Sequence, residues 1–184
     1  LGWEVTYADE NYGMASDVNL GTASSLAFSH THRFADRSEL KTSLRASQYE
    51  RDQRASAVRI APSSAQPGAV TVTQDNFGPW VVLRRSNGTG VQAKIQGLDT
   101  LSIQSDYDQK FQALGWRHHV LAGLDFAKDD FTGYAAVNPA SGAILKPNTT
   151  VGSVNDGAWI DESLRRVRRS SAFESAATGV YAQD

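Results

Sequence analysis

The stretch Leu98–Asp129, LDTLSIQSDYDQKFQALGWRHHVLAGLDFAKD, decides the fold of this chain. It divides at Leu114-Gly115 into two halves in which apolar and polar residues alternate, and a period of two is typical of a β-strand with two different faces. The alternation runs for about a dozen residues on each side, whereas strands of soluble proteins usually have about 5–6. A strand that crosses a membrane needs about 9–11 residues. The stretch therefore predicts a hairpin of two membrane-spanning strands.

The same pattern recurs on either side of this hairpin. Residues 19–34 and 39–57 alternate around a compact polar turn, Ala35–Ser38, and residues 171–184 resemble a fifth strand. Residues 1–18 are expected to form a solvated connector. Short turns thus alternate with two long connections, 58–96 and 136–170, which are rich in Pro and Gly. Within these connections residues 70–72 and 80–83 could form short strands. No helix is needed anywhere in the chain, and 161–169 is the only plausible short one.

The predicted fold class is all-β. Antiparallel up-and-down hairpins form an open segment of a transmembrane β-barrel, with about five long strands, short periplasmic turns and long extracellular loops. In such a wall one face meets lipid and the other meets a wet lumen. The residues predicted to face lipid are Leu26, Phe28, Leu40, Leu44, Leu101, Ile103, Val120, Leu124, Phe126 and Val180. The residues predicted to face the lumen are Lys41, Arg45, Tyr49, Thr100, Gln104, Asp106 and Asp125.

Composition narrows the possible classes further. No run of about 18 apolar residues is present, so a transmembrane helix is not expected. The formal net charge of -2 argues against a nucleic-acid partner attracted by bulk positive charge. There is no cysteine, which excludes disulfides and thiolate metal sites. The N-terminus does not resemble a signal peptide, and the C-terminus stops within a strand-like pattern. We therefore expect residues 1–184 to be part of one barrel domain, cut at both ends.

Several segments resemble the barrel strands of TonB-dependent siderophore receptors. They are His30–Phe34, Ala46–Arg54, Val120–Phe126 and Thr178–Asp184. In Val120–Phe126 a small and an acidic residue interrupt an apolar run, and Thr178–Asp184 ends in Tyr-x-Gln-Asp. The order and spacing of these segments carry the resemblance, which extends from about Tyr12 to Asp184. The resemblance implies a barrel of about 22 strands closed by a plug domain. No plug domain, TonB box or terminal strand ending in an aromatic residue is found in the chain.

The resemblance also implies a function and its partners. Such a receptor lies in the outer membrane of a Gram-negative bacterium, among lipid and lipopolysaccharide, and takes up ferric siderophores. The TonB complex drives this import through the plug. The ferric siderophore is then a transported ligand, and no cofactor is expected. The chain is expected to act in transport and not as an enzyme.

The residues that could carry other chemistry have ordinary explanations in this fold. His30 and His32 are separated by about three strand spacings, roughly 14 Å, from His118 and His119 if strands pair in chain order, so they cannot share one ion. We expect histidines at the periplasmic interface and no metal site. No Gly-x-Ser-x-Gly motif or phosphate-binding loop is present.

Arginine and tryptophan residues in the long loops are the candidates for ligand binding. Guanidinium groups and aromatic rings suit anionic ferric chelates by charge and stacking. The predicted residues are Trp80, Arg84, Arg85, Trp159, Arg165 and Arg166. Lipopolysaccharide phosphate is an alternative partner for the cluster Arg165–Arg169, and a solvated rim is another interpretation.

Two further classes of function stay open at the level of sequence. One is a TonB-dependent receptor for another ligand, or a passive porin. The other is a soluble β-sandwich binding module, which predicts short strands and two apolar faces that meet in one core.

Overall fold

The computed structural model of the 184-residue chain describes residues 11–86 and 91–184. The part of the expected N-terminal connector that precedes residue 11 lies outside these residues. No helix in the described part of the chain is long and apolar enough to cross a membrane.

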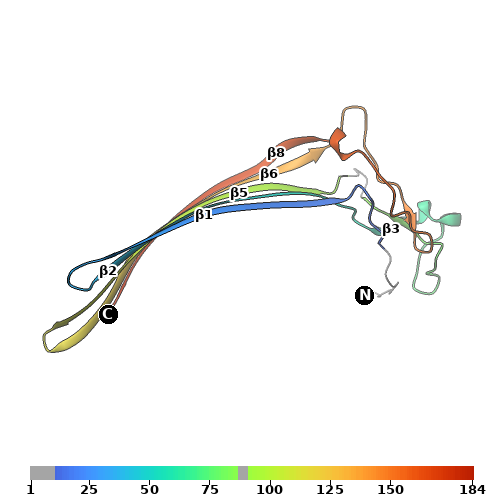
Figure 1. The fold of residues 1–184 in the computed structure, drawn as a ribbon. Coiled ribbons are helices and arrows are strands. Elements are labelled where there is room, and N and C mark those ends of the chain that lie inside the picture. The colour runs from blue at the N-terminus through green and yellow to red at the C-terminus, as the bar shows by residue number, and fades with distance from the viewer. Residues whose placement is uncertain (1–10, 87–90) are drawn as a thin grey trace. The chain divides into compact units, whose positions relative to one another are not determined.

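Five long strands dominate the fold (Figure 1). They are β1 (Val18–Arg33), β2 (Glu39–Arg54), β5 (Ala93–Ala113), β6 (Trp116–Val137) and β8 (Arg166–Gln183). They form one sheet in the order β1-β2-β5-β6-β8, so that neighbours in this sheet follow chain order. The sheet is open, with β1 at one edge and β8 at the other. The predicted all-β fold class of long antiparallel hairpins is therefore confirmed.

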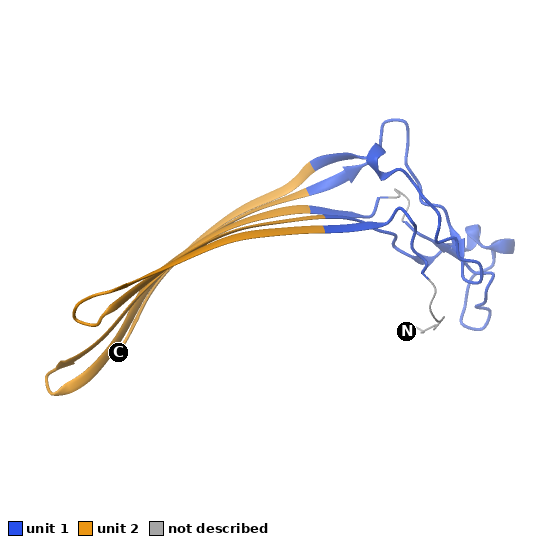
Figure 2. Cartoon of the chain, viewed as in Figure 1, with its two compact units in different colours: residues 1–20, 52–95, 134–168 blue, residues 21–51, 96–133, 169–184 orange. Residues whose placement is uncertain are grey.

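The chain divides into two compact units, coloured separately in Figure 2. The first, here called the loop unit, comprises residues 1–20, 52–95 and 134–168. The second, the sheet unit, comprises residues 21–51, 96–133 and 169–184 and contains most of the long strands.

The two tight turns of the sheet unit follow from local backbone conformation. Between β5 and β6 the connection is Leu114-Gly115, and both residues have positive φ, 52° and 81°. A two-residue hairpin loop with both φ values positive is the type I′ turn, which matches the twist of the flanking strands. Between β1 and β2, Arg37 has φ 70° and donates its N–H to the Phe34 carbonyl. The Asp36 side chain accepts hydrogen bonds from the N–H and the hydroxyl of Ser38.

The loop unit contains a second, smaller sheet of three short strands. These are β3 (Arg59–Ile60), β4 (Val82–Arg84) and β7 (Thr149–Thr150), in the order β3-β4-β7. Val81, Leu83 and Val151 form its buried core, with Trp80 and Phe77 packed against them. Three short 3₁₀ helices complete the unit: η1 (Ser63–Ala65), η2 (Pro67–Ala69) and η3 (Glu162–Leu164).

Four local expectations differ from the structure. Residues 70–72 are not a strand, and the strand expected at 80–83 lies at Val82–Arg84, because Trp80 and Val81 precede it as a turn. In 161–169, the only stretch judged plausible as a short helix, a single 3₁₀ turn forms at Glu162–Leu164. The fifth strand starts at Arg166 and not at residue 171, so most of the arginine cluster belongs to a strand.

Candidate functional site

The sheet unit places its apolar and polar residues on opposite faces, as the alternation predicted. Thr42 and Ser105, which share parity with Leu44 and Leu101, lie 2.8 Å apart between their hydroxyl oxygens on one face. We call this the apolar face. On the other, the polar face, the hydroxyl oxygens of Ser29 and Ser43 lie 3.2 Å apart.

The apolar face has no protein core behind it. Of the ten residues predicted to face lipid, six are exposed: Leu26, Phe28, Leu44, Leu101, Leu124 and Val180. The other four, Leu40, Ile103, Val120 and Phe126, are half-buried. All residues of the sheet unit are described, and none of them is a buried hydrophobic residue. The buried hydrophobic residues of the described chain all lie in the loop unit. The two meeting apolar faces that a soluble β-sandwich requires are therefore not found in this unit.

Aromatic and histidine rings gather on the apolar face near the tight turns. His32 and Phe34 meet edge to face with ring centroids 4.5 Å apart, and Phe34 approaches Tyr107 at 6.4 Å. Phe111 stacks on His118 at 5.1 Å. The predicted strand order keeps the two histidine pairs three strands apart. In the described part of the chain no cluster of three or more His, Cys, Asp or Glu residues could hold a metal ion.

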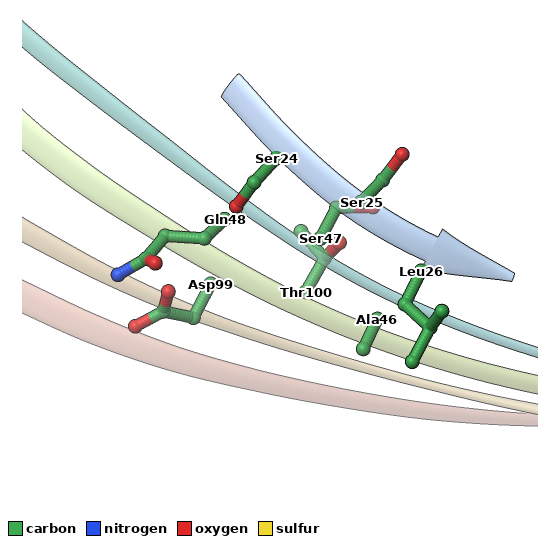
Figure 3. Close-up of a pocket in the computed structure, with 8 residues that line it drawn as sticks. All are labelled: Ser24, Ser25, Leu26, Ala46, Ser47, Gln48, Asp99 and Thr100. Carbon is green, nitrogen blue, oxygen red and sulfur yellow. The ribbon is translucent and has the colours of Figure 1, made fainter. Parts of the chain in front are cut away.

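At the opposite end the apolar face turns polar. Figure 3 shows a shallow hollow across β1, β2 and β5 in which Leu26 and Ala46 point to the same side, followed by Gln48 and Asp99. The same face also becomes charged on β6 and β8. There the Lys128 ammonium nitrogen lies 2.8 Å from a carboxylate oxygen of Glu174 and 3.4 Å from one of Asp130. The apolar band is thus bounded by rings at the turns and by charges toward the loops.

The polar face is crossed by side-chain hydrogen bonds between β5, β6 and β8. The Tyr181 hydroxyl donates to Asp106, which also accepts from the Gln104 amide at 3.1 Å. The Tyr181 ring lies over Gly123, where a Cβ would come within 2.5 Å of it. His119 and Asp108 are joined at 2.6 Å.

In the loop unit, Arg85 is fully buried and ties three segments together. Its guanidinium donates to the carbonyl oxygens of Tyr12 at 2.8 Å, Asn155 at 2.5 Å and Pro147 at 3.4 Å. Burial lowers the pKa of Arg85, while the charges of Asp17 and Asp156 act in the opposite direction. All three acceptors are backbone carbonyl groups. The buried Arg85 side chain therefore holds the loops together, and its guanidinium group is not exposed to a ligand in solvent.

A second buried network surrounds Lys146 and Arg165. The Lys146 side chain is 1% exposed and its ammonium lies 2.7 Å from Asp17 and 3.9 Å from Glu162. Arg165, whose side chain is 0% exposed, donates to Glu162 at 2.7 Å and to the Ile144 carbonyl at 2.6 Å. Burial alone raises the pKa of Asp17, but hydrogen bonds from Lys146 and Ser56 and the charge of Lys146 outweigh it, so the pKa lies below its ordinary 3.8.

The other residues predicted to bind a ligand are more accessible. Trp159 is 64% exposed, and Arg166, the first residue of β8, is exposed as well. Trp80 is half-buried because it packs against the core of the small sheet. Arg84 is half-buried in β4, and its Nε is buried without a hydrogen-bond partner in the described chain. That these residues bind a ligand stays a prediction.

Sequence reasoning missed Lys146 and Arg59. Lys146 lies in a stretch with Pro and Asn that is typical of an exposed loop. No local pattern predicts that its side chain is buried beside Asp17 and Glu162, which are distant in sequence. Arg59 stands alone in the sequence, yet β3 places it directly opposite Arg84.

Comparison with solved structures gives fold relatives. The open and the closed form of the ferric-catecholate import receptor Fiu from E. coli K12 both match with a TM-score of 0.70 and 17% sequence identity. The matches cover 94% of this chain and 24% and 22% of the receptor chains, so the chain spans about a quarter of their length. No protein-family profile and no curated protein sequence matches the chain. At this identity the likeness shows a shared fold, an open sheet of long strands with its loops.

Proposed function

We propose that this chain is a segment of an outer-membrane receptor that imports ferric siderophores in a TonB-dependent manner. The observation that carries the proposal is the sheet unit: a single sheet with one apolar face, one polar face and no interior. Because exposed apolar surface of this extent is unfavourable in water, such a face requires a nonaqueous neighbour. The fold shared with part of the ferric-catecholate import receptor points to the same class of protein.

The dimensions of the apolar band support a membrane as that neighbour. Leu101 to Phe111 on β5, or Trp116 to Phe126 on β6, spans ten residue steps, about 34 Å along an antiparallel strand. With the usual barrel strand tilt of about 35–45°, this becomes about 26 Å, close to the roughly 25 Å apolar band of outer-membrane barrels. The rings that end the band near the turns correspond to an aromatic girdle.

The remaining assignments follow from this location. The apolar face would contact lipid, and the polar face would line a lumen occupied by water and by a plug domain that couples to the TonB complex. The loop unit would face the cell exterior, near lipopolysaccharide, and select the ligand. Among its candidate ligand residues, Trp159 and Arg166 are exposed and therefore the most accessible. The protein would act in transport and not in catalysis.

The proposal is tested in the host with the full-length gene. Deletion should abolish uptake of radiolabelled iron supplied as a ferric catecholate under iron limitation, and complementation should restore it. The protein should fractionate with the outer membrane. Uptake that is unchanged by deletion for every ferric chelate tried would overturn the siderophore assignment.

A receptor for another ligand and a passive porin are the alternatives. Dissipating the proton-motive force with an uncoupler separates them. Import through a TonB-dependent receptor should stop, whereas diffusion through a porin should continue. Membrane fractionation without ferric uptake would favour a receptor of the same fold for another solute.

A further inference from the structure

Two arginines stand face to face on the small sheet of the loop unit. Arg59 of β3 is paired with Arg84 of β4 in antiparallel register. Directly paired residues have their side chains on the same face of a sheet, with Cβ atoms about 4.5–5.5 Å apart. Like charges placed in this way repel each other and destabilise the pair.

This pair lacks the polar partners that Arg54, Arg85 and Arg165 of the loop unit have. Arg54 lies 2.9 Å from Asp52, Arg165 lies 2.7 Å from Glu162, and Arg85 is bonded to three carbonyl groups. Within residues 11–86 and 91–184, neither Arg59 nor Arg84 has an ion pair or hydrogen-bonded side-chain acceptor. The Nε of Arg84 is buried without a hydrogen-bond partner in the described chain, which is unfavourable for a charged group.

The rest of the small sheet explains why this arrangement persists. Val81, Leu83 and Arg85 are buried on one side of the strand, so alternation directs Val82 and Arg84 to the other. The Gln66 side chain accepts from the Val82 N–H at 2.8 Å and donates to the carbonyls of Ala61 and Val82 at 2.9 and 3.0 Å. These bonds join β3 to β4 and fix the register that brings the two arginines together.

We propose that Arg59 and Arg84 form an oxyanion-binding site on the open face of the small sheet. A guanidinium presents its N–H donors as a planar fork that fits paired oxygens, so two adjacent forks suit a group of two or more negative charges. A phosphate and the catecholate oxygens of an anionic iron chelate share this chemistry. The proposal of an oxyanion site depends only on the arginine pair. The proposal that this site binds an iron chelate also rests on the proposed function.

The test is direct binding to the full-length protein in detergent micelles, measured by isothermal titration calorimetry. The probes are inorganic phosphate and the ferric complex of 2,3-dihydroxybenzoate. The variants are Arg59→Gln, Arg84→Gln and the double substitution. Lys94→Gln, which removes one exposed positive charge elsewhere in the loop unit, is the matched control. We expect each single variant to lose at least tenfold in affinity and the double variant to lose little more, because both arginines hold one group.

The outcomes separate the two proposals. Loss of affinity for both probes supports the site and its use for a chelate. Loss for phosphate alone, with chelate binding unchanged or absent, supports the site and assigns it to phosphate groups, without bearing on transport. No binding of either probe to the wild type, or equal losses in Lys94→Gln, overturns the site. Arg59 is exposed, so Arg59→Gln keeps the test valid if Arg84→Gln does not fold.

Discussion

Asp17 joins three segments of the loop unit through one carboxylate, those around residues 14–17, 56 and 146. It accepts hydrogen bonds from the Met14 N–H at 3.1 Å, from the N–H and hydroxyl of Ser56 at 3.0 Å each, and from the Lys146 ammonium at 2.7 Å. These bonds favour the ionised carboxylate, which is why the pKa of Asp17 is lowered. Removing one partner of a largely buried charge pair costs about 3–5 kcal/mol, because the other charge is left uncompensated.

The lowered pKa predicts a loss of loop stability in acid. The folded state holds its proton more weakly than the unfolded chain, so the contribution of Asp17 is fully present above pH 3.8 and is lost as the pH falls through the folded pKa. After correction for the pH dependence of the intrinsic exchange rate, protection against hydrogen–deuterium exchange in peptides covering 11–20 and 52–60 should therefore fall below that pH in the wild type. Asp17→Asn should exchange faster at neutral pH and lose this acid dependence. An unchanged acid response in Asp17→Asn would refute the assignment.

Gly123 makes room for a tyrosine on the polar face. A Cβ at this position would lie 2.5 Å from the Tyr181 ring and 2.9 Å from Asp106. Gly123→Ala should therefore displace Tyr181, break its hydrogen bond to Asp106 and lower stability by about 1–3 kcal/mol. The check is a double-mutant cycle with Tyr181→Ser, measured by guanidine unfolding of the full-length protein in vesicles. Gly123→Ala should cost much less in the Tyr181→Ser background, and equal costs in both backgrounds would count against this contact.

Single residues were the part of the site that the sequence predicted least well. Arg85 and Arg165 were predicted to bind a ligand because they are cationic residues in long loops. The structure buries both with internal acceptors instead, and these acceptors come from segments up to 73 residues away. Such long-range pairings are set by how the loops pack together, and no periodicity or local spacing encodes them.

At the scale of elements, the turn between β5 and β6 carries a local conflict. Leu114 adopts a positive φ of 52° and is 96% exposed, so its side chain gains nothing from packing. A positive φ is strained for a branched residue, and type I′ turns favour Asn-Gly.

Leu114→Asn should stabilise this hairpin by about 1 kcal/mol, because asparagine tolerates the left-handed conformation. Guanidine unfolding of the full-length protein in vesicles would register the change as a higher midpoint with an unchanged slope. Leu114→Val, which keeps the residue apolar and adds branching at Cβ, is the opposing control and should lower the midpoint. A lower midpoint for Leu114→Asn would contradict the turn assignment.

Elements were predicted well where two faces alternate, and poorly where they do not. The first strand and the hairpin of β5 and β6 lie within a few residues of their expected bounds, because the alternation there is long and uninterrupted. The start of β8 was missed because Arg166, Arg168 and Arg169 give it no apolar parity. Residues 161–169 were the only stretch judged plausible as a short helix, and pairing with β6 makes Arg166–Arg169 part of a strand instead.

At the scale of the whole molecule, the proposed membrane location depends on which face of the sheet carries a substitution. Leu124 lies on the apolar face and is exposed, whereas Leu121, three residues earlier on the same strand, lies on the polar face. The pair offers the same chemical change on opposite sides of one wall.

Leu124→Arg should destabilise the full-length protein in phospholipid vesicles by about 2–4 kcal/mol, the cost of an arginine facing lipid near the bilayer midplane. Leu121→Arg should cost less, because that face would be wet. The measurement is the free energy of unfolding by guanidine, with outer-membrane abundance in cells as a second readout. A larger effect at Leu121 than at Leu124 would reverse the proposed orientation of the wall.

The absence of an interior in the sheet unit has a consequence for how this protein is made. A soluble domain is stabilised when its apolar side chains leave water and pack into a core, and this unit has no buried hydrophobic core. If the proposed membrane location holds, its strands gain this stabilisation only in a bilayer, so secretion and insertion belong to the folding reaction. Before insertion the chain would then need periplasmic chaperones, and its yield would depend on the capacity of the assembly machinery as much as on its own sequence.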